Sequence, residues 1–270
     1  MRMRHGICVC TLGDLAEPCL VVDIGRAAEK AGWESLFVWD HLAFAWGVPS
    51  ADPCVTLAAV AQATSALRLG TAVTPLPRRR PAVVASAVAT LDRLSRGRVV
   101  LGVGLGGVDA EFTAFGESAE LKSRARLLDA GLEIVGGLLG GASVGGVTLA
   151  PLPVQRPRPP ILVGGASRAA LRRAARWDGW IAAGDEESGR MAVRPESVAA
   201  DIAYIRGHRE SAFEVALTGT SRGPDDPMLA EYEQAGVTLW LEHIHGRRGP
   251  LEDLMRRIDD GPAKVGGQAK

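Results

Sequence analysis

The chain contains few cysteines. Its four cysteines, Cys8, Cys10, Cys19 and Cys54, all lie in the first fifth of the 270 residues. Neither a second cysteine pair nor a spaced histidine pair completes a set of zinc ligands. The sequence therefore predicts reduced, mostly buried thiols and no metal site.

The chain also has no excess charge and no long hydrophobic run. Lys plus Arg equals Asp plus Glu at 31 each, so no overall field attracts nucleic acid or an anionic membrane. The basic run Arg78–Arg80 is local and suits either a phosphate contact or a solvated loop. The apolar run near the amino terminus is too short for a secretory signal and is broken by Gly13 and Asp14. We expect a cytoplasmic protein that binds neither nucleic acid nor membrane.

The segment from Leu67 to Gly107 shows how the chain is organised. Leu67–Val73 and Val99–Val103 are short apolar runs typical of buried strands. Between them, Pro81 opens a helix with apolar residues at helical spacing, in which Asp92 is expected to face solvent. Two buried strands joined by a helix predict a parallel strand pair with a crossover.

The same alternation continues along the whole chain. The other expected strands are His5–Cys10, Ser35–Trp39, Ile161–Val163, Trp180–Ala183, Phe213–Leu217 and Val237–Leu241. The expected helices begin near Leu20, Pro53, Pro81, Lys122, Arg168, Pro195, Met228 and Leu251, and Ser143–Pro160 is an irregular connection. Eight strands, each followed by a helix, predict a single (β/α)8 TIM barrel over residues 1–260, with 261–270 as a disordered tail. The alternative is an open, doubly wound sheet.

In such a barrel the chemistry lies at the carboxyl ends of the strands. The candidates there are Thr11, Asp40, His41, Thr74, Gly104–Gly107, Gly164–Ser167, Glu242, His243 and His245. His41 follows a buried strand with a carboxylate beside it, which suits either a proton donor or acceptor or a histidine that anchors a loop. For His243 and His245, loop or helix-start roles are favoured.

Two glycine-rich segments are candidate ligand sites. Gly102, Gly104 and Gly107 match a GxGxxG pattern after a strand, but no helix follows at once, so the match to a dinucleotide fingerprint is weak. The segment Gly164–Ser167 puts backbone N–H groups and a hydroxyl at the start of a helix, where an anion binds well, and Arg168 adds charge.

Several motifs in register resemble the bacterial luciferase-like flavin-dependent oxidoreductases. They are AEKAGWESLFVWDHL from Ala28, LRLGTAVTPLPRRRP from Leu67, ATLDRLSRGRVVLGVGLGG from Ala89, PRPPILVGG from Pro157, ARWDGW from Ala175 and EQAGVTLWLEHI from Glu233. The resemblance implies a barrel, usually dimeric, that holds FMN or the deazaflavin coenzyme F-420. The chain is short for the family, and its insertion after the seventh strand is small.

Carried over to this sequence, the resemblance also implies a site. The ring of the cofactor would lie over Ala72, Val73 and Thr74, with a non-prolyl cis peptide bond between Ala72 and Val73. The tail phosphate would bind at Gly104, Gly106, Gly107, Gly164, Gly165 and Ser167, next to Arg168. His41, with Asp40 beside it, would be the catalytic group on the substrate side.

The leading functional hypothesis is a flavin- or deazaflavin-dependent oxidoreductase or monooxygenase acting on a small organic substrate as a homodimer. A second hypothesis is a non-catalytic relative that acts through its dimer surface. A third is an NAD-dependent dehydrogenase built on an open sheet, for which Asp129 or Glu133 would have to be the acidic residue beyond the glycine turn.

Overall fold

The computed structural model describes residues 2–186, 189–211 and 213–263. Its strands are β1 (Arg4–Val9), β2 (Ser35–Val38), β3 (Arg68–Thr71), β4 (Thr74–Pro75), β5 (Val99–Gly104), β6 (Ile161–Gly164), β7 (Gly179–Ala183), β8 (Glu214–Gly219) and β9 (Leu239–Ile244). The α-helices are α1 (Pro18–Ala31), α2 (Pro53–Ala63), α3 (Pro81–Leu94), α4 (Ala110–Thr113), α5 (Leu121–Leu139), α6 (Arg168–Ala174), α7 (Pro195–Arg206), α8 (Met228–Gln234) and α9 (Leu251–Asp259). Short 3-10 turns are η1 (Gly13–Ala16), η2 (Ala43–Trp46), η3 (Leu76–Arg78) and η4 (Gly246–Arg248).

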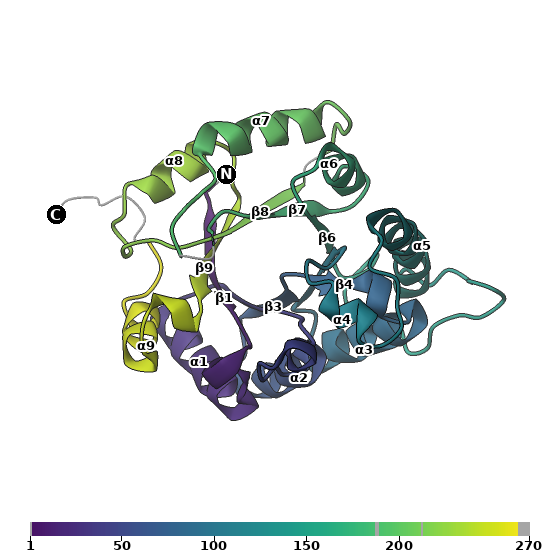
Figure 1. Cartoon of the computed structure of the whole chain (residues 1–270), viewed down its shortest axis with the longest axis horizontal. Coiled ribbons are helices and arrows are strands. Elements are labelled where there is room, and N and C mark those ends of the chain that lie inside the picture. The colour runs from purple at the N-terminus through teal and green to yellow at the C-terminus, as the bar shows by residue number, and fades with distance from the viewer. Residues whose placement is uncertain (1, 187–188, 212, 264–270) are drawn as a thin grey trace.

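All strand pairings between these strands are parallel, and the sheet closes on itself with the helices outside (Figure 1). The short strands β3 and β4 occupy one position of the barrel, because both pair with β5. The chain therefore forms the predicted (β/α)8 TIM barrel, and the open doubly wound sheet, on which the NAD-dependent hypothesis depended, is wrong.

The strand is interrupted between β3 and β4 by a cis peptide bond between Ala72 and Val73, which confirms the predicted position. Val73 is partly buried against the residues that fill the barrel. The cis bond thus lies at the carboxyl end of the barrel, next to the candidate site.

Apolar side chains form two layers of core. The barrel interior is filled by Cys8, Phe37, Val100, Leu162, Ile181, Ala216, Leu239 and Leu241. A larger layer lies between the barrel wall and the helices and includes Ile7, Leu36, Leu101 and Val163. This alternation follows from the two-residue period of a strand, since neighbouring residues point to opposite faces.

Helix starts and stops follow the sequence closely. Asp52 caps α2 by accepting hydrogen bonds from the N–H groups of Cys54 and Val55, and Pro53 occupies the first turn. Gly32 ends α1 with a φ of 90°, which is the left-handed region that favours glycine. These local signals set the lengths of the helices and so the positions of the strands that follow.

Two expectations about this fold are wrong. The last strand runs from Leu239 to Ile244, so Glu242 and His243 lie within it and only His245 follows it. Asp92 is fully buried, because its carboxylate accepts hydrogen bonds from the N–H groups of Val154 and Gln155 at 2.7 and 3.0 Å. A buried carboxylate with such partners holds the irregular 143–160 connection against α3.

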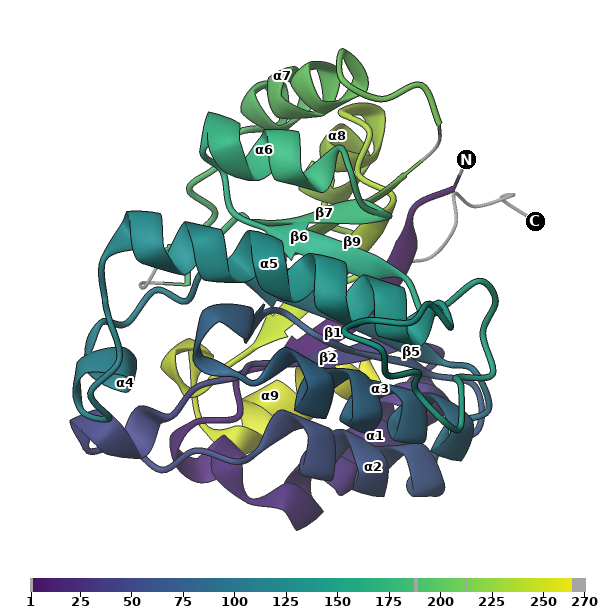
Figure 2. The ribbon, with the colours of Figure 1, turned by 90° about the vertical axis from the view of Figure 1, so that its right-hand side faces the viewer.

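Of the predicted tail, residues 264–270 lie outside the described residues, whereas Gly261 is buried and accepts a hydrogen bond from Arg257. Cys8 and Cys10 are buried free thiols as predicted, but Cys19 is exposed and Cys54 half-buried. In the ranges that the structure describes, no helix combines the length and the apolar character needed to cross a membrane. Figure 2 shows α4 at one end of the barrel and the amino terminus at the other, and the site described below lies at the α4 end.

Candidate functional site

A histidine and a buried carboxylate meet at the carboxyl mouth of the barrel. His41 follows β2, and its Nδ1 lies 2.6 Å from Oε1 of Glu111, which belongs to α4 and is 1% exposed. The indole N–H of Trp46 donates to the same oxygen at 3.3 Å. These contacts fix the orientation of the imidazole and leave its Nε2 without a hydrogen bond within the described part of the chain.

A buried ion network supports this pair from below. Arg78 donates to Oδ1 of Asp40 at 2.9 Å, and its Nη2 lies 3.4 Å from Oε2 of Glu111. Arg79 donates to the same Asp40 oxygen at 2.7 Å. The Arg78 and Asp40 side chains are each 1% exposed, so the predicted catalytic residue Asp40 lies beneath the mouth rather than in it. Arg78 and Arg79, the first two residues of the basic run, therefore have a mainly structural role in these ion pairs.

The charges of the network set the state of Glu111. Burial works to raise the pKa of Glu111, but the hydrogen bond and charge of His41, the Arg78 guanidinium and the Trp46 hydrogen bond together hold that pKa below its usual value. Glu111 is therefore a carboxylate at neutral pH. A carboxylate accepts the Nδ1–H of His41, so the neutral imidazole has its lone pair on Nε2.

Aromatic rings surround the imidazole. The Trp39 ring lies 5.4 Å from the His41 ring on one side, and the Trp46 ring lies edge-on at 6.4 Å on the other. Phe44 and Phe115 stack edge to face at the rim and are more than half exposed. The mouth thus presents an apolar, aromatic surface around one polar ring nitrogen.

Val73 explains two of the predicted cofactor-binding glycines. A Cβ added at Gly104 would lie 2.6 Å from Val73 Cγ2, and one added at Gly164 would lie 2.9 Å from Val73 Cγ1. Both positions therefore need glycine for close packing around the cis bond, whether or not a ligand binds. Thr74, at the start of β4, is buried.

The glycine loop after β5 has mixed roles. Gly106 has a φ of 81° and its carbonyl accepts a hydrogen bond from the buried Arg124. Gly107 is exposed, with open space where a Cβ would be. The GxGxxG match is not a dinucleotide fingerprint, because α4 begins only at Ala110 and is one turn long.

The segment between β6 and α6 is open at the mouth. Residues 165–169 are exposed, and Ser167 caps α6 by accepting the N–H of Ala170 at 3.2 Å. Gly165 has a φ of 115°, and its carbonyl accepts the indole N–H of Trp180 at 2.8 Å. Arg168 instead stacks on Tyr204, 4.3 Å from the ring centre, and pairs with Asp201. The N–H of Gly165 donates to the Ile181 carbonyl at 3.4 Å, so the backbone available to an anion is that of Ala166 and Ser167, whereas Arg168 is held against α7.

Two further histidines, His243 and His245, lie near Trp39. His243, 6% exposed, has its ring 5.0 Å from Trp39 and its Nδ1 2.7 Å from Asp185. Burial, together with the neighbouring His243, lowers the pKa of His245 to about 4, against the attraction of Asp185. His245 is therefore neutral at physiological pH.

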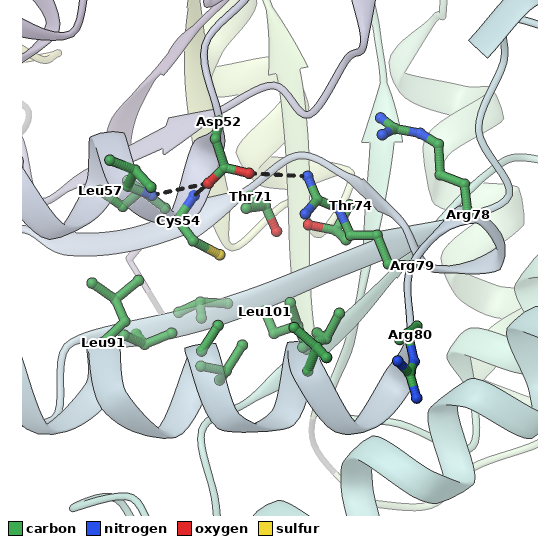
Figure 3. Close-up of a pocket in the computed structure, with 17 residues that line it drawn as sticks. Asp52, Cys54, Leu57, Thr71, Thr74, Arg78, Arg79, Arg80, Leu91 and Leu101 are labelled. Atoms are coloured by element: carbon green, nitrogen blue, oxygen red, sulfur yellow. Dashed lines mark hydrogen bonds and ion pairs between the residues drawn. The ribbon is translucent and has the colours of Figure 1, made fainter. Parts of the chain in front are cut away.

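A separate cavity of about 500 Å³ lies outside the barrel wall, between α2 and α3 (Figure 3). Leu57, Leu91 and Leu101 line it, and Arg79 and Arg80 lie at one end. Burial raises the pKa of the Cys54 thiol there to about 11. Thr74 and Arg78 also line the cavity, so it reaches the residues below the mouth, but His41 and Glu111 do not line it.

A family model described as luciferase-like monooxygenase matches residues 13–262. An uncharacterised protein of Mycobacterium tuberculosis (strain ATCC 25618 / H37Rv) is 31% identical over 218 residues, covering 71% of this chain and 72% of that protein. F420-dependent glucose-6-phosphate dehydrogenase 1 of Rhodococcus jostii (strain RHA1) is 44% identical over 120 residues, covering 42% of this chain and 36% of that enzyme. A solved F420-dependent secondary alcohol dehydrogenase, 18% identical, superposes with a TM-score of 0.75 over 90% of this chain and 93% of its own.

The chain therefore belongs to the luciferase-like monooxygenase family, as the motifs predicted. It is an oxidoreductase of the flavin- or deazaflavin-dependent class. The fold it shares with the alcohol dehydrogenase is the closed barrel described above.

Sequence reasoning missed two residues of the mouth: Glu111 and Asp185. Glu111 is a single carboxylate between Ala110 and Phe112 in the segment after the glycine loop, and only that apolar setting marks it as buried. Asp185 follows β7 in a stretch that reads as an acidic surface loop. The HxH spacing of His243 and His245 was the one sequence signal that these two side chains lie together, since residues two apart on a strand share a face.

Proposed function

We propose that the protein is a deazaflavin-dependent oxidoreductase in which His41 transfers a proton to or from an oxygen of a small organic substrate. The observation that carries the proposal is the 2.6 Å contact between His41 Nδ1 and the buried Glu111 carboxylate at the barrel mouth. The F420 dependence of the similar Rhodococcus enzyme and alcohol dehydrogenase supports the choice of deazaflavin over FMN.

The residues at the mouth fit a flavin-type group. Ala72, Val73 and Trp39 are partly buried on top of the apolar barrel interior, which gives a flat ring an apolar floor. The exposed backbone at Ala166 and Ser167 offers N–H groups to a phosphate. We propose Ala72, Val73 and Thr74 as the ring contacts and Gly164, Gly165 and Ser167, with the Gly104–Gly107 loop, as the phosphate contacts.

The cofactor, when bound, supplies hydride transfer, and the chain handles the proton. As a substrate hydroxyl is oxidised, its proton goes to Nε2 of His41, and Glu111 stabilises the resulting imidazolium through Nδ1–H. In the reverse direction the imidazolium returns that proton to the oxygen of a carbonyl. Asp40 and Arg78 take no proton in this scheme and hold the pair in place.

Turnover with oxidised deazaflavin and a panel of small alcohols tests the proposal. We expect loss of the oxidised cofactor's absorbance with one or more alcohols, and no such loss with His41→Ala. Turnover only with reduced FMN and oxygen would instead identify a monooxygenase and overturn the choice of cofactor.

We also propose that the chain forms a homodimer through α2 and α3. Val55 on α2 is 69% exposed and Val83 on α3 is 60% exposed, beside the apolar cavity between these helices (Figure 3). A partner surface that covers them removes apolar area from water.

Light scattering during size-exclusion chromatography tests the dimer. We expect a mass of two chains for the unsubstituted protein and of one chain for the Val55→Glu, Val83→Glu double variant. Val147→Glu is the matched control, because Val147 is 65% exposed in the 143–160 connection and not on α2 or α3. A double variant that stays dimeric would place the interface elsewhere.

A further inference from the structure

Three metal-binding side chains converge at the mouth beside the His41–Glu111 pair. One ligand atom from each of Asp185, His243 and His245 lies within 4.8 Å of the others. Oδ2 of Asp185 lies 2.7 Å from Nδ1 of His243 and 4.0 Å from Nε2 of His245. Metal ligands around one ion are about 3 to 3.5 Å apart, given bond lengths of about 2.0–2.2 Å, so small side-chain rotations suffice to close the set.

The strand positions these residues. Leu239 and Leu241 of β9 point into the barrel, and the two-residue period continues that face to His243 and His245. Asp185 comes from the loop after β7, two barrel positions away across β8. The cluster is therefore built on the barrel frame, and His243 packs on the same Trp39 ring as His41.

The cluster is buried, and one of its ring nitrogens is unpaired among the described residues. The side chains of Asp185, His243 and His245 are 4, 8 and 7% exposed, and Nε2 of His243 has no hydrogen-bond partner in the described part of the chain. In that part of the chain, the only side chains that bond to Asp185 are these two histidines. The neighbouring Arg248 is paired with Glu242 at 2.6 Å, so its charge is largely neutralised.

We propose that Asp185, His243 and His245 bind one divalent cation of the Zn²⁺ type. Two imidazoles and one carboxylate are a ligand set typical of zinc, and three protein ligands leave a fourth position for water or for an oxygen of a substrate. The sequence predicted no metal site because the carboxylate comes from a distant loop. His243 packs on Trp39 at the edge of the proposed cofactor floor, but binding of the ion requires no cofactor.

Binding has one structural consequence. Nδ1 of His245 accepts the N–H of Arg247 at 3.2 Å, which places the proton of the neutral ring on Nε2. A cation on Nε2 moves that proton to Nδ1, so the contact with Arg247 breaks and η4 loses its cap. The NMR signals of the His245 ring should therefore show a change from the Nε2–H to the Nδ1–H tautomer when the ion binds.

The test is a calorimetric titration of the chelator-treated protein with Zn²⁺. Metal analysis after dialysis then measures how much of the ion is retained. All variants carry Cys19→Ser, because Cys19 is an exposed thiol that could bind zinc by itself. We expect one tightly bound ion per chain. Asp185→Asn, His243→Gln and His245→Gln should each weaken binding by about a hundredfold or more.

His208→Gln is the matched control, because His208 is exposed on the far side of α7 and its Nδ1 contacts the Tyr204 carbonyl. It should bind zinc like the unsubstituted protein. Equal stoichiometry and affinity in all four variants, or no binding by the folded unsubstituted protein, would overturn the proposal. If a ligand variant fails to fold, histidine NMR of the unsubstituted protein decides: changes at His243 and His245 support the site, and changes elsewhere or none refute it.

Discussion

Val73 and Gly104 interlock at the carboxyl end of the barrel. The 2.6 Å that would separate Val73 Cγ2 from a Cβ at Gly104 is shorter than any normal contact, so each residue determines what the other can be. Gly164 packs against the opposite methyl group of the same valine. The glycines around the cis bond thus shape the floor on which we place the cofactor ring.

Gly104→Ala should destabilise the protein by about 1–3 kcal/mol, because the added methyl group overpacks against Val73. The Val73→Ala, Gly104→Ala double variant should be more stable than the sum of the two single effects predicts, since the smaller side chain makes room. Urea unfolding of the four proteins in this cycle measures the coupling. Additive effects would show that the two side chains do not interact.

Ser167→Asp should weaken cofactor binding at least tenfold while the fold stays intact. Aspartate caps a helix as well as serine, but its charge repels a phosphate at the same backbone N–H groups. Ser167→Ala is the control: it loses the cap to Ala170 and about 1 kcal/mol of stability, but it adds no charge and should weaken cofactor binding much less than Ser167→Asp. Fluorescence titration and thermal unfolding separate the two effects. Normal binding by Ser167→Asp would place the phosphate elsewhere.

His41→Ala should reduce turnover by about a hundredfold or more with little change in cofactor affinity. The reason is that His41 faces the aromatic mouth through Nε2, away from the proposed phosphate contacts. His208→Ala, which changes an exposed histidine, should leave turnover unchanged. Steady-state kinetics and cofactor titration provide both values, and unchanged turnover in His41→Ala would reduce His41 to a loop anchor.

Glu111 should make the free energy of unfolding depend on pH. Its folded-state pKa lies below the ordinary value of 4.5, although burial opposes this, because His41, Arg78 and Trp46 stabilise the carboxylate. A group with a lowered pKa contributes stability above its unfolded-state pKa and loses that contribution as the pH falls through the folded-state pKa.

The difference in unfolding free energy between the unsubstituted protein and Glu111→Gln should therefore shrink on acidification below about pH 4.5. Chemical denaturation at a series of pH values measures it. Glu117→Gln, a change at an exposed glutamate in the same segment, should show only a small difference at any pH. A Glu111→Gln difference that grows toward low pH would contradict the assigned charge state.

The sequence predicted the barrel well because its signals are local. Apolar runs, the proline at the start of α3 and the cap at Asp52 each depend on a few neighbouring residues. The position of the cis bond came from family resemblance, since no local pattern identifies it. The boundary of β9 was missed because Glu242 is a charged residue, and the partners that allow its burial, Ser221 and Arg248 among them, lie outside the strand.

The site was predicted only in part for the same reason. His41 stood out beside a buried strand, but its partner Glu111 is 70 residues away along the chain. Asp185 and His243 are likewise 58 residues apart. Such pairs form only when the closed barrel brings successive strand ends together, and a single sequence carries no direct record of that contact.

The central claim is tested most directly by equilibrium titration of the purified protein with the deazaflavin and with FMN, in which the fluorescence of each cofactor ring reports binding. We predict saturable binding of the deazaflavin at one site per chain, weakened by Ser167→Asp and retained by His41→Ala. Binding of neither cofactor would contradict the account and favour a non-catalytic relative that acts through its dimer surface.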